Sequence, residues 1–171
     1  MKQTMKFNIL VVILIALLNA CSIGGKLRED LKASSYDYDP PSKANWRKLG
    51  ERAGSDIAFA NPKSGATILI NSTCFRYQDS SLKSLSKNLL SPLGKYEIIK
   101  QENREINKRK ALWTHVKGEI DGVTVENILL VHRKNQCLFD FALLSPLAIQ
   151  KADQLAFENL VNSFRYDRWI K

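Results

Sequence analysis

Between Tyr96 and Leu144 the sequence alternates strand-like stretches with short polar turns, and this pattern constrains the fold more than any other feature. The turns are Asn107-Lys108-Arg109, Asp121-Gly122 and the stretch from Arg133 to Gln136. An Asp-Gly pair suits a two-residue type I′ turn, which joins antiparallel strands. The pattern therefore predicts a four-stranded antiparallel meander with strands over residues 96–106, 111–120, 123–132 and 137–144.

The segments on either side add further strands and two helices. Residues 56–59 and 66–75 are rich in strand-forming side chains and are separated by turn residues, so we expect a hairpin, with Trp46 beginning the folded part as an irregular edge strand. A helix is expected over 81–91, and after Ser145-Pro146 the apolar residues return to a helical period. The order ββαββββα predicts an α+β fold in which an antiparallel sheet packs with two helices.

This order of elements resembles the Mog1/PsbP-like family. The matching stretches are DIAFANPKSGATILI, EINKRKALWTHVKGEIDGVTV and FENLVNSF, and the resemblance covers roughly residues 46–166. It implies a non-enzymatic adaptor or accessory role. The sequence also resembles exported lipoproteins of that fold.

Residues 1–20 have the composition of a secretory signal peptide. A short basic stretch precedes an entirely apolar run from Ile9 to Leu18, which is too short for a stop-transfer helix. The sequence Leu18-Asn19-Ala20-Cys21 resembles the lipobox of bacterial lipoproteins, in which the cysteine is lipidated and becomes the first mature residue. We therefore expect lipidation at Cys21. The alternatives are a cleaved signal with a chance cysteine and an uncleaved anchor.

Residues 21–45 are expected to form the lipidated N-terminus and a flexible tether, followed by a single domain over 46–171. The tether contains adjacent glycines, adjacent prolines and the repeat Tyr36-Asp37-Tyr38-Asp39, so it has little apolar surface to offset the entropy of ordering, although its tyrosines could dock on the domain. By the lipoprotein resemblance, Ser22 in place of Asp favours the periplasmic side of the outer membrane over the inner membrane.

Cys74 and Cys137 remain once Cys21 is assigned to the lipid. An exported compartment favours disulfides, so we expect these two cysteines to be bonded. The alternative is two unpaired thiols that pack as small apolar side chains. Two cysteines without a nearby pair of histidines fall short of a zinc ligand set, and no metal is expected.

The sequence carries none of the common catalytic or nucleotide-binding motifs, so neither a catalytic residue nor a cofactor is expected. His115 and His132 lie on neighbouring predicted strands but about four residues out of register, too far apart to share a metal. Asp140 lies in a strand that is apolar on both faces, and we expect it to pair with a Lys or Arg rather than to act in catalysis. An enzyme built on Asp140 and a histidine would need those groups to converge in an open cleft.

The formal net charge is +9, and basic residues cluster at Arg104, Lys108, Arg109 and Lys110. Charged side chains at a hairpin tip are ordinarily just solvated. The functional alternative is contact with an anionic surface, such as phospholipid headgroups, outer-membrane glycolipid or an acidic partner. Nucleic acid is not an expected partner of an exported lipoprotein.

These observations predict a non-enzymatic lipoprotein that acts as an accessory or binding module of an envelope protein assembly. Its expected partners are the membrane, through the lipid anchor, and an envelope protein. The alternative is a lipid or small-molecule carrier with a pocket between sheet and helices. A continuous apolar cavity larger than ~300 Å³ would favour the carrier, and a filled core would reject it.

Overall fold

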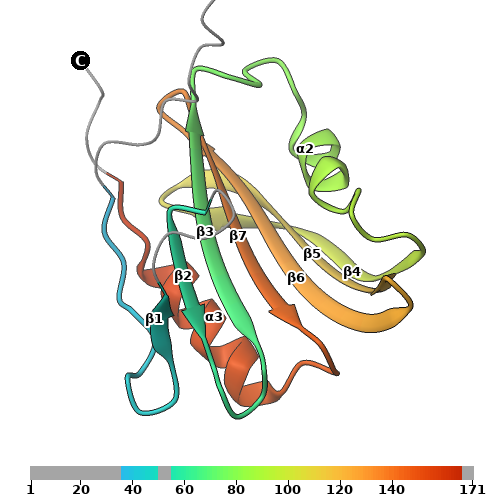
Figure 1. Cartoon of the computed structure of the whole chain (residues 1–171). Helices are drawn as coiled ribbons and strands as arrows, with labels where there is room; N and C mark the ends of the chain where they lie inside the picture. Colours follow the sequence, from blue (N-terminus) through green and yellow to red (C-terminus); the bar gives the residue numbers. More distant parts are fainter. Residues whose placement is uncertain (1–35, 50–54, 167–171) are drawn as a thin grey trace, which may run out of the picture.

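The computed structural model describes residues 36–49 and 55–166, which form an α+β fold around one seven-stranded antiparallel sheet (Figure 1). The elements are β1 (Arg47–Leu49), β2 (Ile57–Ala60), β3 (Thr67–Cys74), α2 (Leu82–Leu89), β4 (Tyr96–Ile106), β5 (Arg109–Ile120), β6 (Val123–Lys134), β7 (Cys137–Ser145) and α3 (Lys151–Ser163). The strand order across the sheet is β1-β2-β3-β7-β6-β5-β4. The predicted fold class is confirmed, and the edge strand expected near Trp46 is β1.

The turns of the meander form where the sequence predicts them. Asp121 and Gly122 have φ values of 51° and 79°, as a type I′ turn requires. The β4–β5 turn is Asn107-Lys108, also with positive φ at both residues, so Arg109 belongs to β5 rather than to the turn. Because each turn sets the register of the strands it joins, β4 to β7 pair in the order of the chain.

The larger core lies between the sheet and α3. Alternation along β7 turns Phe139 and Phe141 towards this core, where they meet Phe157 and Phe164. The Phe139 and Phe164 rings are 4.9 Å apart in an edge-on arrangement. Each such buried side chain contributes about 1.5–3 kcal/mol to folding, and this cluster holds more buried apolar residues than the two on the other face.

The helix α3 begins at Lys151, four residues later than the apolar pattern from Leu147 suggests. Leu147 is 69% exposed, and the backbone N–H of Ile149 donates to Glu126 Oε2 at 3.1 Å. The chain therefore passes the start of β6 as an irregular segment before the helix starts.

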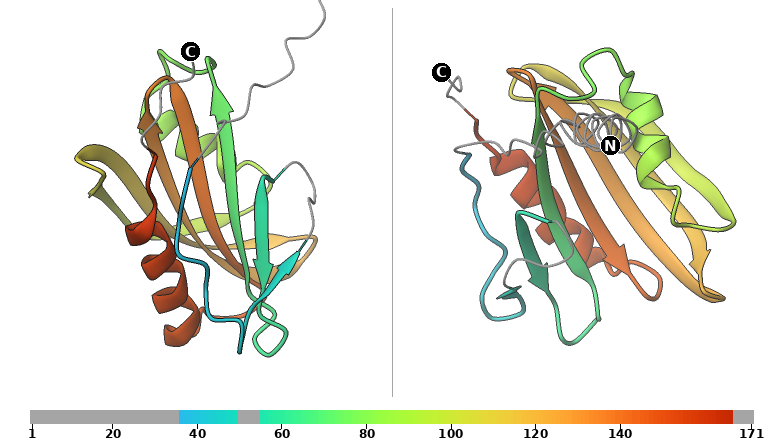
Figure 2. Two further views of the ribbon diagram at one scale, coloured as in Figure 1. Left: turned by 90° about the vertical axis from the view of Figure 1, so that its left-hand side faces the viewer. Right: turned by 45° about the horizontal axis from the view of Figure 1, so that its top comes forward.

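The helix α2 covers part of the opposite face of the sheet (Figure 2). Ser81 caps it by accepting a hydrogen bond from the Ser84 N–H at 3.0 Å. At 1.5 Å per residue its eight residues span only about 12 Å. It packs mainly on β5 and β6, and among the described residues no helix covers the β3–β7 part of this face beside Ala142.

The segment from Tyr36 to Asn45 packs on the domain, although the sequence placed it in the tether. The Tyr36 ring lies 5.8 Å from that of Phe139, and the backbones of Asp37 and Arg165 pair as an isolated bridge. The expectation that the tyrosines dock is therefore met. The remainder of the predicted tether, residues 21–35, lies outside the described residues.

Candidate functional site

Within the described part of the chain, an open groove lies on the α2 face of the sheet, beside the short helix and over parts of β3 and β7. Register places Leu69, Ala142 and Leu129 side by side across β3, β7 and β6, and they form its floor. The floor is hollow because the small Ala142 side chain stands between two leucines. The volume of the groove is about 280 Å³.

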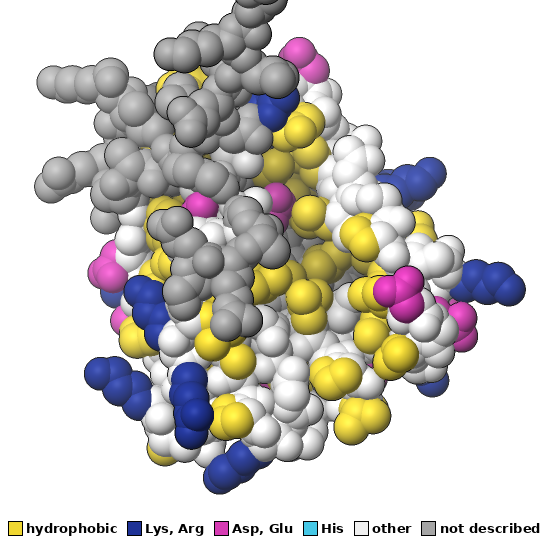
Figure 3. All heavy atoms as spheres, in the orientation of Figure 1, with side chains coloured by type: hydrophobic (Ala, Val, Ile, Leu, Met, Phe, Trp, Pro, Cys, Tyr) yellow, Lys and Arg dark blue, Asp and Glu magenta, His cyan; other side chains and the backbone are white. Residues whose placement is uncertain are grey.

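Apolar side chains from α2, the segment after it and the end of β5 form the wall of the groove. They are Leu89, Pro92, Leu93 and Ile120. Leu89 is 38% exposed because it projects over the groove instead of reaching the sheet. Figure 3, which views this face, shows apolar side chains gathered between the strands and α2.

Three polar side chains lie among the apolar ones. Asn71 and Asp140 are direct cross-strand partners on β3 and β7. Asn127 on β6 is the cross-strand partner of Leu144 on β7, so it lies on the opposite side of the leucine floor from Asn71 and Asp140. Asn127 is 6% exposed. A mostly apolar hollow with a few fixed polar groups is typical of a binding site for apolar or amphipathic ligands. Its volume falls just short of the ~300 Å³ that would favour the carrier hypothesis.

A larger depression, of about 740 Å³, lies between the segment 39–46 and α3. At its base the Asn61 amide donates to Asp153 Oδ1 at 2.7 Å, and both residues are buried. This pair joins the loop after β2 to the first turn of α3. Asn61 and Asp153 therefore hold the helix in place, and we take the α2-face groove as the candidate site.

The sheet separates Asp140 from both histidines. Asp140 lines the groove, whereas His132 lies on the α3 face, with its ring 6.3 Å from that of Phe139. His115 also belongs to the α3 face and interacts with Glu126. These three residues therefore do not converge in one cleft, as the enzyme hypothesis would require. The expected pairing of Asp140 with a Lys or Arg stays a prediction.

Register confirms that the two histidines are out of step. His115 pairs with Ile128, whereas His132 pairs with Ala111, which lies four residues before His115 in β5. Sequence reasoning missed the partner of His115, Glu126, whose other carboxylate oxygen accepts from the backbone of Ile149. Counting residues outward from the Asp121-Gly122 turn would have placed Glu126 diagonally across from His115.

His132 is completely buried. Burial, together with the positive charges of Lys134 and Arg109, lowers the pKa of His132 from its ordinary 6.5 to about 4. The imidazole is therefore neutral near pH 7 and packs as an aromatic side chain against Phe139 and Phe164.

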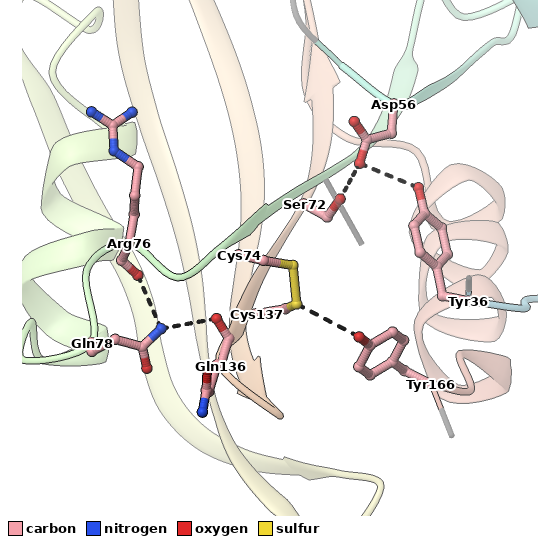
Figure 4. Close-up of a disulfide and its surroundings, with 9 residues drawn as sticks. All are labelled: Tyr36, Asp56, Ser72, Cys74, Arg76, Gln78, Gln136, Cys137 and Tyr166. Atoms are coloured by element: carbon pink, nitrogen blue, oxygen red, sulfur yellow. Dashed lines mark hydrogen bonds between the residues drawn. A yellow bond between two sulfur atoms is a disulfide. The ribbon is translucent and has the colours of Figure 1, made fainter. Parts of the chain in front are cut away.

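The disulfide between Cys74 and Cys137 is formed (Figure 4). The two cysteines are direct partners on β3 and β7, and the Tyr166 hydroxyl lies 3.6 Å from Cys137 Sγ. The bond links β3 of the N-terminal hairpin to β7, the last strand of the meander, which pairs with it.

A second polar cluster holds the segment that begins at Tyr36 (Figure 4). The hydroxyls of Tyr36 and Ser72 both donate to Asp56 Oδ2. Burial, and then the charge of Asp56, raises the pKa of Tyr36, so its hydroxyl stays protonated and remains a donor.

The predicted basic cluster divides into two parts. The Arg104 guanidinium lies 3.6 Å from the centre of the Trp113 ring and 2.8 Å from Glu102, on the α3 side of the sheet. Lys108, Arg109 and Lys110 are exposed at the β4–β5 turn. Arg104 is therefore neutralised within the fold, whereas the other three are available at the surface.

Residues 1–20 and Cys21 lie outside the described part, so the signal peptide and the lipidation stay predictions. Neither α2 nor α3 has the length and apolar character of a membrane-spanning helix. Across 36–49 and 55–166, no three His, Cys, Asp or Glu side chains are arranged to hold a metal ion.

Three solved structures share this arrangement of elements. Cyanobacterial PsbP (CyanoP) from Synechocystis sp. PCC 6803 matches with a TM-score of 0.52 and 14% identity over 84% of this chain and 99% of its own. The fold is PsbP-like. LpqN from Mycobacterium tuberculosis, described as involved in cell envelope biogenesis, matches with a TM-score of 0.51 and 15% identity over 81% and 88% of the two chains.

A structure from Bacteroides thetaiotaomicron matches with a TM-score of 0.53 and 12% identity, over 81% of this chain and 47% of that one. This chain thus spans about half the length of the Bacteroides protein. No protein-family model and no curated protein matches the sequence. The PsbP-like fold expected from the sequence is confirmed. At these identities the likeness concerns the fold alone.

Proposed function

We propose that the protein is a non-enzymatic lipoprotein, anchored through Cys21 on the periplasmic side of the outer membrane, that serves as a binding module of an envelope protein assembly. The observation that carries this proposal is the groove over Leu69, Ala142 and Leu129, an apolar surface that the described residues leave open. The structural likeness to LpqN, described as involved in cell envelope biogenesis, supports an envelope role.

In this proposal the groove receives an apolar segment of the partner protein. Burying apolar surface contributes roughly 25 cal/mol per Å², and the exposed wall residue Leu89 would lose its contact with water when the segment binds. The polar residues Asn71, Asn127 and Asp140 would then set the register of the bound segment through hydrogen bonds.

The anchor is tested by metabolic labelling with palmitate. The wild-type chain should incorporate the label, and Cys21→Ala should not. A wild-type chain that takes up no palmitate, or a Cys21→Ala chain that still does, would contradict the lipoprotein assignment.

The groove is tested by photo-crosslinking in intact cells. A photoreactive residue at Leu89 should capture an envelope protein, and Ala142→Phe, which fills the floor, should abolish this adduct. The matched control is Ala44→Phe, the same change at an exposed position away from the groove. An adduct that survives Ala142→Phe would refute the assignment of the groove.

The apolar lining also favours a second candidate, a carrier of a lipid or small molecule. Organic extraction of protein purified in mild detergent, followed by mass spectrometry, separates the two. The carrier requires a lipid in stoichiometric amount that is absent from Ala142→Phe. The binding module requires no such lipid.

A further inference from the structure

Two basic turns lie at one end of the sheet. Successive turns of an antiparallel meander alternate between ends, so the β4–β5 and β6–β7 turns share an end and the β5–β6 turn lies at the other (Figure 1). We define the basic end by four residues, which are Lys108, Arg109, Lys110 and Lys134. The opposite turn carries Asp121 instead, next to Glu119 in β5.

The charges of the basic end are not neutralised within the fold. Of the residues that the structure describes, none lies within salt-bridge distance of these four side chains. The carboxylate that faces them is Glu105, the cross-strand partner of Lys110. Nearby Arg165, by contrast, is paired with Asp37 and Asp39. The four side chains therefore present net positive charge to solvent at this end.

The segment that leads back to Cys21 joins the domain at the same end. The Asn107 side chain, in the β4–β5 turn, donates to the carbonyl of Phe164 at 2.8 Å. The next residue, Arg165, pairs through its backbone with Asp37. Only fourteen residues lie between Cys21 and Tyr36, which limits the reach to about 50 Å.

We propose that the basic end docks on the anionic phospholipid headgroups of the membrane that holds the anchor. The membrane setting rests on the proposed lipoprotein function. Lys and Arg side chains close to an anionic surface each strengthen binding by roughly fivefold, and the attraction fades within about 10 Å at moderate salt. Docking in this way turns the Asp121 turn away from the membrane and leaves the groove open at the side.

The test uses the chain from residue 21 with Cys21→Ser, which lacks the lipid site and retains every described residue. Its binding is measured by co-sedimentation with vesicles of phosphatidylcholine alone and of phosphatidylcholine with one-fifth phosphatidylglycerol. The variant Lys108→Gln/Arg109→Gln/Lys110→Gln removes three charges of the basic end. The matched control, Lys83→Gln/Lys87→Gln/Lys95→Gln, removes three exposed charges from α2 and the segment before β4.

The parent chain and the control should bind the anionic vesicles, and high salt should release them. The basic-end variant should bind roughly a hundredfold more weakly. Equal binding by the variant and its parent, an equal loss in the control, or equal binding to neutral vesicles would overturn the proposal. Because the Cys21→Ser chain carries no covalent lipid anchor, a failure of the anchor assignment would not affect the result.

Discussion

Acidification should destabilise the fold through one residue, His132. Its pKa is about 4 in the folded protein and 6.5 when unperturbed. The unfolded state therefore takes up a proton at a higher pH than the folded state does. The stabilisation by the neutral imidazole is complete above about pH 6.5 and is lost as the pH falls towards the folded pKa.

The size of the effect follows from the two pKa values. At about pH 4.5 the unfolded chain is almost fully protonated at this site, whereas the folded protein is mainly neutral. The linkage relation gives a loss of about 2.5 kcal/mol relative to neutral pH. This is a large part of the 5–15 kcal/mol typical of a domain.

The assay compares urea unfolding of the wild type with that of His132→Leu at about pH 7 and about pH 4.5. Carboxylates titrate in both proteins, so the difference between their losses isolates the histidine. The wild type should lose about 2.5 kcal/mol more than the variant. Since the chain has only two histidines, the His132 ring can also be titrated directly by NMR. Equal losses, or a titration midpoint near 6.5, would refute the reasoning.

Three further predictions concern stability. Replacing both Cys74 and Cys137 by Ala should cost about 4 kcal/mol in chemical unfolding, on the chain-entropy model for a sequence separation of 63, and the unreduced wild type should show no free thiol from this pair on denaturation. Arg104→Ala should cost about 1 kcal/mol through lost stacking on the Trp113 ring, with Arg104→Lys in between; an unchanged midpoint would argue against the stacked geometry. Ser81→Ala should cost about 1 kcal/mol and speed amide exchange in α2 more than in α3.

The meander could be predicted closely because its information is local. The turn Asp121-Gly122 sets the pairing of β5 with β6, and counting from it gives the four-residue offset between His115 and His132 that the structure shows. Alternation along β7 likewise predicts which side chains share the face of Phe139. Such patterns depend on neighbours in sequence, whose backbone preferences the residues themselves carry.

The groove could not be predicted in the same way. Its floor contains Leu69 of β3 and Ala142 of β7. These residues become neighbours only because β7 pairs with β3, which lies far away in the sequence. Its opening depends on α2 being too short to cover β3. The sequence predicted a helix over 81–91, but the helix ends at Leu89, and this residue lines the groove at 38% exposure.

The basic residues likewise show a difference between what the sequence predicts and what the tertiary structure decides. Arg104 and Lys108 belong to one cluster in the sequence, yet Arg104 lies on the Trp113 ring and Lys108 faces solvent. By itself the sequence predicted the order of elements, the turns of the meander and the bond between Cys74 and Cys137. Only the tertiary structure decided that β7 lies beside β3, which face the described helices leave uncovered and which of the described charges remain unpaired. Those outcomes depend on contacts between residues far apart in the chain, and local periodicity does not record them.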